Sequence, residues 1–212
     1  MCIICASPKG APQPTTAQVK TMFAHNPHGA GYMVARNGRV EIHKGFMVLD
    51  DLLRQLDQEQ FTPDDVVVYH FRISTQAGGL PSMTHPFPLT AAIENCEKLD
   101  LTCSVGVAHN GIIHMTSNGS KRFSDTAIFI SRYMSHIIRH QKDLHDEALL
   151  EVLEELTRSK LAILDKSGYL ATVGPFIREE NGLLFSNTSY REITFRGVKN
   201  SFRKGGQLQW EL

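Results

Sequence analysis

The chain has 212 residues, of which 42% are hydrophobic, and its 22 basic side chains balance its 22 acidic ones. This length and composition predict one domain, residues 1–212, whose core is large enough to fold without a disulfide scaffold. The even charge excludes a strong field for nucleic acid or an anionic membrane, and no apolar run nears the roughly 20 residues of a membrane span, so we expect a cytoplasmic protein without nucleic-acid or membrane partners.

Turn residues and hydrophobic periodicity divide the chain into short elements. In chain order these are strands at residues 1–6, 31–35 and 39–43, a helix at 49–56, strands at 66–69 and 104–108, helices at 124–138 and 146–156, and strands at 161–164, 169–173, 183–186 and 193–195. Asn37-Gly38 is a strong signal for a two-residue hairpin, and Ser124 is the expected N-cap of the long helix. This order predicts an α+β fold of stacked antiparallel sheets covered by helices.

Cys2 is the most informative residue, because removal of Met1 would leave a thiol and a free α-amino group on one residue. The thiolate is the attacking form, and a free thiol titrates at about 8.5. An α-amino group titrates at about 7.7 to 8.0 and can take the thiol proton near neutral pH. A small second residue is also common in proteins, so position alone is a weak motif.

Cys2 and Cys5 form a C-x-x-C pair that could bind zinc together with Cys96 and Cys103. The second pair is wider than the usual zinc spacing of about two to four residues, which favours the nucleophile hypothesis. In a strand, Cys5 would face away from Cys2 and become a core residue. We therefore expect no metal and no organic cofactor.

Four further segments carry polar residues that are hard to explain by structure alone. They are His70-Phe71-Arg72-Ile73-Ser74-Thr75, Thr84-His85-Pro86-Phe87, Ala108-His109-Asn110-Gly111-Ile112-Ile113 and Ser124-Asp125-Thr126. With Cys2 in front of them, in this order, the chain resembles the class II glutamine amidotransferase domain of the N-terminal nucleophile (Ntn) hydrolases. The resemblance runs to about residue 135 and continues weakly to about residue 190, where 182–187 is similar to a late core strand. It implies a four-layer αββα sandwich.

Asn110-Gly111 has two interpretations. Asn110 carries amide donors, and the Gly111 N–H can approach a ligand closely because glycine has no Cβ. Two donors converging on one oxygen would form an oxyanion hole. Loss of one such donor typically costs about 2.7 to 4 kcal/mol of transition-state stabilisation. Asn-Gly is equally typical of a tight hairpin turn. His109 and the resemblance favour the oxyanion hole.

Arg72 presents a planar fork of donors that suits the α-carboxylate of an amino acid. The resemblance assigns Asp125 to the α-ammonium group of the same substrate, although an aspartate before a helix is also a common cap. If Ser124 caps the helix, Asp125 is available for the substrate. Arg72 and Asp125 together would then recognise both charges of glutamine.

The resemblance also places the Thr75 hydroxyl near the substrate and gives His85 a supporting role in the site. Two positions depart from the family pattern, which often has Trp after the arginine and His after the threonine. This chain has Ile73 and Gln76 there, which puts the lid over the substrate and some substrate contacts in question.

The expected function is hydrolysis of the glutamine side-chain amide through a thioester on Cys2, with Asn110 and Gly111 stabilising the oxyanion. The family usually passes the ammonia to a second domain. The residues after about 190 are too few for one, so either a separate ammonia-accepting subunit receives the ammonia or the domain hydrolyses an amide for its own sake. One alternative is an Ntn amidohydrolase for another amide, such as a γ-glutamyl compound. Another is a non-catalytic binding module that keeps Met1.

Overall fold

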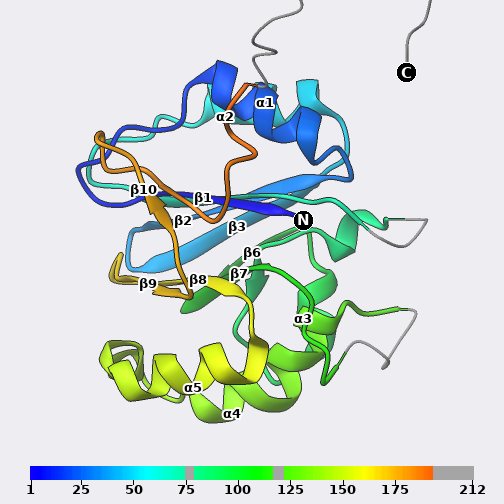
Figure 1. The fold of residues 1–212 in the computed structure, drawn as a ribbon, viewed down its shortest axis with the longest axis vertical. Coiled ribbons are helices and arrows are strands. Elements are labelled where there is room, and N and C mark those ends of the chain that lie inside the picture. The colour runs from blue at the N-terminus through cyan, green and yellow to red at the C-terminus, as the bar shows by residue number, and fades with distance from the viewer. Residues whose placement is uncertain (75–78, 117–121, 193–212) are drawn as a thin grey trace, which may run out of the picture.

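A computed structural model describes residues 1–74, 79–116 and 122–192, and within them the strands form two antiparallel sheets (Figure 1). The larger sheet has the order β10-β11-β1-β4-β2-β3-β6 and the smaller one the order β5-β7-β8-β9. The strands are β1 (Ile3–Ser7), β2 (Ala30–Arg36), β3 (Arg39–Phe46), β4 (Val66–Phe71), β5 (Phe87–Pro88), β6 (Asp100–Cys103), β7 (Val105–Asn110), β8 (Lys160–Asp165), β9 (Leu170–Val173), β10 (Ile177–Arg178) and β11 (Leu184–Phe185).

Helices cover the outer faces of the two sheets. They are α1 (Thr16–His25), α2 (Leu49–Gln58), α3 (Asp125–Phe129), a π-helical turn at Ile130–Met134, α4 (Ser135–Ile137) and α5 (Glu147–Thr157), with short 3₁₀ turns at Pro81–Met83, Ile93–Glu97 and Gln141–His145. Figure 1 shows α1 and α2 against the larger sheet, and α3, α4 and α5 beyond the smaller one. None of the helices in the described segments has the length and apolar character needed to cross a membrane.

Three groups of buried apolar side chains hold these elements together. One group joins α1 and α2 to the larger sheet, a second lies between the two sheets, and a third joins the smaller sheet to α3, α4 and α5. The expected α+β class with two antiparallel sheets is confirmed. The finer expectation, a four-layer αββα sandwich, stays a prediction.

Side chains of β1 alternate between two of these groups. Ile3 and Cys5 pack with the helices, whereas Ile4 and Ala6 pack against the smaller sheet. Cys5 has no exposed surface, which confirms it as a core residue, and burial raises the pKa of its thiol. Continued by one residue, the same alternation directs Cys2 toward the smaller sheet.

Most predicted elements are present, with boundaries shifted by a few residues. The hairpin turn is confirmed, since Asn37 and Gly38 have φ angles of 53° and 70°. Ser124 caps α3 by accepting a hydrogen bond from the Ala127 N–H at 3.1 Å. The strand predicted at 193–195 lies outside the described residues.

Helix α1 and strands β5, β6 and β10 were missed by the sequence analysis. Helix α1 lies just after a proline-rich stretch, which suggested a loop. Its signal was a capping box, in which Thr15 and Gln18 each accept a hydrogen bond from the backbone N–H of the other.

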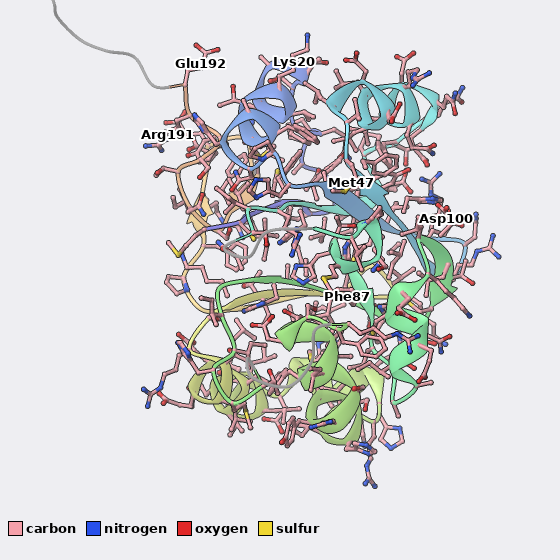
Figure 2. The ribbon with its side chains drawn as sticks, turned by 90° about the vertical axis from the view of Figure 1, so that its right-hand side faces the viewer. Lys20, Met47, Phe87, Asp100, Arg191 and Glu192 are labelled. Atoms are coloured by element: carbon pink, nitrogen blue, oxygen red, sulfur yellow. The ribbon has the colours of Figure 1, made fainter. Side chains whose placement is uncertain are left out.

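The segment after β11 is anchored on α1. The His25 Nδ1 atom lies 2.8 Å from the Ser189 carbonyl oxygen, and the rings of Phe185 and Tyr190 stack with centroids 3.7 Å apart. Figure 2 shows the last described residues, Arg191 and Glu192, on the side of the molecule where Lys20 projects from α1. This anchoring fixes the chain on both sides of residues 186 and 187.

Gly31 in β2 has no room for a side chain. A Cβ atom there would lie 2.4 Å from the His85 carbonyl oxygen and 2.8 Å from the Lys44 Cα, both backbone atoms. At Gly106 the nearest atom is the adaptable Met33 Sδ at 2.5 Å. We expect Gly31→Ala to lower the free energy of unfolding by about 2 to 3 kcal/mol and Gly106→Ala by about 1 kcal/mol. Urea titrations would measure both, and equal losses would contradict this account of β2.

Candidate active site

Cys2 lies immediately before β1, beside the end of β4. Its Sγ accepts a hydrogen bond from the Ile73 N–H at 3.5 Å and lies 3.6 Å from the Ile73 carbonyl oxygen. Burial raises the pKa of the Cys2 thiol, while the Ile73 N–H, the Arg72 charge and the N-terminal charge oppose the rise. A thiol with a raised pKa is protonated at neutral pH, so it needs a base before it can attack.

Met1 projects into solvent with 84% of its surface exposed. The bond between Met1 and Cys2 is therefore accessible at the end of the chain. The Cys2 carbonyl is held on the other side, because the Asn187 side-chain Nδ2 donates a hydrogen bond to it at 2.7 Å.

Arg72 follows β4 and approaches Cys2. Its backbone N–H donates to the Gly29 carbonyl at 2.8 Å, which holds the residue against the start of β2. Its Nη2 donates to the Ser74 hydroxyl at 3.3 Å, whereas its Nη1 is buried with no partner among the described residues. A Cβ at Gly79 would lie 2.5 Å from that Nη1, so glycine leaves the guanidinium its space. Burial lowers the pKa of Arg72, and the charges of Cys2 and Asp125 oppose the shift.

Asp125 is the first residue of α3, and its carboxylate accepts two backbone hydrogen bonds. Oδ2 accepts from the Ile113 N–H at 2.7 Å and Oδ1 from the Thr126 N–H at 2.8 Å. The carboxylate thus holds the loop that follows β7 to the start of α3. Oδ1 also accepts from the Thr126 hydroxyl at 3.3 Å, so about one of the roughly four acceptor positions of a carboxylate remains for a cationic ligand.

Asn110 ends β7, and Gly111 turns the chain away from the sheet toward α3. The chain does not return to an adjacent strand here, so the hairpin interpretation of Asn110-Gly111 is wrong. Gly111 has a φ of 153°, and a Cβ there would lie 2.2 Å from the Ser159 Oγ. Asn110 is buried, and its Nδ2 donates to the Ser186 hydroxyl at 2.8 Å.

His85 belongs to a buried cluster with His70 and His109 between β4, β7 and the segment before β5. His70 Nε2 lies 2.9 Å from the His109 carbonyl oxygen and 3.0 Å from the His85 Nδ1. A carbonyl only accepts, so His70 Nε2 carries a proton and His85 Nδ1 is an acceptor. The His109 Nδ1 lies 2.8 Å from the Thr126 hydroxyl. The cluster therefore links the end of β4 to β7 and α3.

Burial keeps all three histidines neutral. It lowers the pKa of His70 to about 3, lowers that of His85 well below its ordinary value, and also lowers that of His109, where the Asp125 charge opposes the shift. His85, which we expected to support the site, is hydrogen-bonded to His70 and lies within the histidine cluster.

Thr75 and Gln76 lie outside the described residues. Of the other expected site residues, Cys2 and Arg72 lie at the ends of neighbouring strands, with the Asp125 charge acting on Arg72. Asn110 is linked to β1 through Ser186, whose hydroxyl also accepts from the Ile4 N–H at 2.8 Å.

Sequence reasoning missed three residues that support the site. Ser186 and Asn187 lie after β11, and His28 Nδ1 accepts a hydrogen bond from the Ser74 N–H at 2.8 Å. Ser186 and Asn187 were seen only as part of a strand. No local pattern distinguishes them from ordinary loop residues.

A hollow of about 620 Å³ lies elsewhere, near the end of α4. Its lining includes the exposed side chains of His136, Arg139 and Lys166, and none of the expected site residues. The hollow therefore lies apart from the candidate site around Cys2 and Arg72. In the part of the chain that the structure describes, no group of three or more His, Cys, Asp or Glu side chains could hold a metal ion.

No protein-family model matches the chain, and no curated protein matches its sequence significantly. The geometry of the site is therefore the basis for any functional conclusion.

The histidine cluster predicts a pH dependence of stability. Because the folded pKa values lie below the ordinary value of about 6.5, the stability contribution is complete above that pH. It is lost as pH falls toward the folded pKa values, which are about 3 for His70 and about 4 for His109. Each histidine can contribute a slope of up to about 1.4 kcal/mol per pH unit. His70→Gln, which keeps a donor for the His109 carbonyl, should reduce the slope measured by urea unfolding between pH 6.5 and 4.5.

His136→Gln is the matched control, because His136 is an exposed histidine on α4. Its slope should equal that of the unsubstituted protein. A His70→Gln slope that is also unchanged would show that His70 takes up a proton in the folded protein.

Proposed function

We propose that this protein is an Ntn hydrolase that converts glutamine and water to glutamate and ammonia. Cys2, freed by removal of Met1, is the nucleophile. Asn110 and Gly111 form the oxyanion hole, and Arg72 and Asp125 bind the two charges of the amino acid. The proposal includes the four-layer αββα arrangement of this class. Three buried apolar groups support it: one lies between α1, α2 and the larger sheet, one between the two sheets, and one between the smaller sheet and the remaining helices.

The chemistry proceeds in two balanced steps. The Cys2 α-amine takes the thiol proton, and the sulfur attacks the side-chain carbonyl carbon of glutamine. The tetrahedral oxyanion collapses, the C–N bond breaks, and the amine returns the proton to the departing ammonia. Water, deprotonated by the same amine, then attacks the thioester carbon. The C–S bond breaks while the amine returns that proton to the sulfur, which releases glutamate and restores the Cys2 thiol.

The observation that carries the proposal is the Arg72 guanidinium beside the Cys2 thiol. Its Nη1 is buried without a partner among the described residues, which is costly for a charged donor unless a ligand completes it. A carboxylate fits such a fork in a bidentate manner. Glutamine bound there through its α-carboxylate would present its side-chain amide to the neighbouring Cys2 thiol.

The electrostatic character of Cys2 also supports an N-terminal mechanism. Burial raises the pKa of the thiol, and the histidines that could serve as bases are engaged in the neutral cluster. The α-amine of Cys2 itself, with an ordinary pKa of about 7.7 to 8.0, supplies a base without any further side chain.

The state of the N-terminus is the first test. Intact-mass analysis should show loss of Met1, and treatment with 6-diazo-5-oxo-norleucine, a reactive glutamine analogue, should add one adduct that peptide mapping assigns to Cys2. Cys2→Ala should remove the adduct and reduce ammonia release from glutamine by at least about 1000-fold.

Cys103→Ala is the control, because Cys103 is a partly buried cysteine on β6, away from the end of β1. It should keep both adduct and activity. A chain that retains Met1 and forms no adduct would contradict the enzyme proposal and leave a non-catalytic binding module. A processed chain without an adduct would indicate a different amide substrate.

Arg72→Lys tests the substrate. Lysine keeps the charge but loses the bidentate fork, so kcat/KM for glutamine should fall by about 10- to 100-fold, mainly through KM. Arg54→Lys is the matched control, since Arg54 is an exposed residue of α2 paired with Asp51. Steady-state assays measure both. Unchanged glutamine hydrolysis in Arg72→Lys would exclude Arg72 as the carboxylate ligand, and a γ-glutamyl compound would then be the substrate to test.

Delivery of the ammonia to a separate acceptor enzyme is also part of the proposal. Affinity purification of tagged Cys2→Ala from its native cells, in the presence of glutamine, would recover such an acceptor. Recovery of no partner, together with ammonia released quantitatively into solution, would favour a free glutaminase.

A further inference from the structure

Ser186 is the buried centre of the contacts behind the candidate site. It follows β11 and has no exposed surface, and its backbone N–H donates a hydrogen bond to the Ile4 carbonyl of β1 at 2.9 Å. Its hydroxyl oxygen accepts from the Ile4 N–H and lies 2.8 Å from the Asn110 amide. One hydroxyl thus contacts both β1, the strand that follows Cys2, and the end of β7.

The hydrogen positions around this hydroxyl are unbalanced. If Asn110 Nδ2 is the donor, Ser186 Oγ accepts hydrogen bonds from two N–H groups, those of Ile4 and Asn110. Neither group can accept a hydrogen bond from the Ser186 O–H. At the same time Asn110 Oδ1 is buried and has no partner among the described residues. An orphaned buried acceptor next to a hydroxyl that lacks an acceptor is an unfavourable combination.

Rotation of the Asn110 amide by about 180° resolves both faults, because its oxygen and nitrogen exchange places with little change in shape. Ser186 O–H then donates to Asn110 Oδ1, while the Ile4 N–H still donates to Ser186 Oγ. The Asn110 NH₂ group takes the position of the unpartnered atom and has donors available for a ligand.

We propose that Ser186 is the positioning residue that orients Asn110, donating its hydroxyl proton to Oδ1 so that Nδ2 faces the developing oxyanion. This inference rests on the proposed function. With the amide reversed, a carbonyl oxygen would face the negative oxyanion and repel it. The next residue, Asn187, holds the Cys2 carbonyl at 2.7 Å, so one dipeptide aligns the nucleophile and the oxyanion hole.

Removal of the hydroxyl should therefore act on turnover. Ser186→Ala is expected to lower kcat for glutamine hydrolysis by about 10- to 100-fold, with KM changed less than about threefold, because Arg72 and Asp125 still bind the substrate. Ser131→Ala is the matched control, since Ser131 is a buried serine of the π-helical turn whose hydroxyl donates to the Ile128 carbonyl of α3. It should keep the kcat of the unsubstituted enzyme.

A double-mutant cycle separates positioning from a general structural effect. Asn110→Ala should lower kcat by about 100- to 1000-fold, and Ser186→Ala/Asn110→Ala should be no slower than Asn110→Ala. Multiplied losses in the double variant, or a Ser186→Ala enzyme with unaltered kcat, would overturn the inference. The rate of Cys2 alkylation by iodoacetamide, which needs no oxyanion hole, checks that the site is folded, and Ser186→Cys replaces Ser186→Ala if that variant does not fold.

A neutron structure of the deuterated protein provides a readout independent of activity. The inference requires a deuteron on Ser186 Oγ directed at an Asn110 Oδ1 that carries none. Two deuterons on the Asn110 atom nearest Ser186 would contradict it, whether or not glutamine is the substrate. Absence of ammonia release by the unsubstituted enzyme would instead contradict the proposed function.

Discussion

The pairing of β1 along both of its edges is the constraint on which the candidate site depends. β4 pairs with one edge and β11 with the other, so the residue before β1 lies between the ends of two neighbouring strands. This brings Cys2 against Ile73 on one side and Asn187 on the other. The residue beyond β4 is Arg72, and a guanidinium beside the thiol follows from the register itself.

Stacking of the two sheets supplies the remaining part of the site. The layer between them is aliphatic near β8 and polar at the end where β4 and β7 carry His70 and Asn110. Burial of uncharged histidines there is costly, and the cost is offset by hydrogen bonds that lock the strand ends to each other. Close approach also requires small residues, and Gly31 and Gly111 occupy positions where a Cβ would collide with neighbouring atoms. A site rigid enough to orient an amide and a thiol needs such support behind it.

Much of the fold could be predicted from local patterns, and the failures have identifiable causes. Asn37-Gly38 and Ser124 act through backbone geometry within a few residues, so their effects were visible in the sequence. α1 was missed because prolines outweighed a capping box. The Asn110-Gly111 turn was ambiguous because the same dipeptide suits a hairpin and a strand end, and only the partner of β7 distinguishes them.

The candidate site divides in the same way. Residue type alone predicted roles for Cys2, Arg72 and Asn110, because a thiol, a fork of donors and an amide each suit few roles, and the resemblance added a role for Asp125. These roles stay predictions. Their supporting contacts depend on tertiary structure, since Asn187 reaches Cys2 from 185 positions away and Ser186 reaches Ile4 from 182. Local sequence specifies turns, caps and strand periodicity through short-range sterics, whereas strand order and sheet stacking decide which distant polar groups meet.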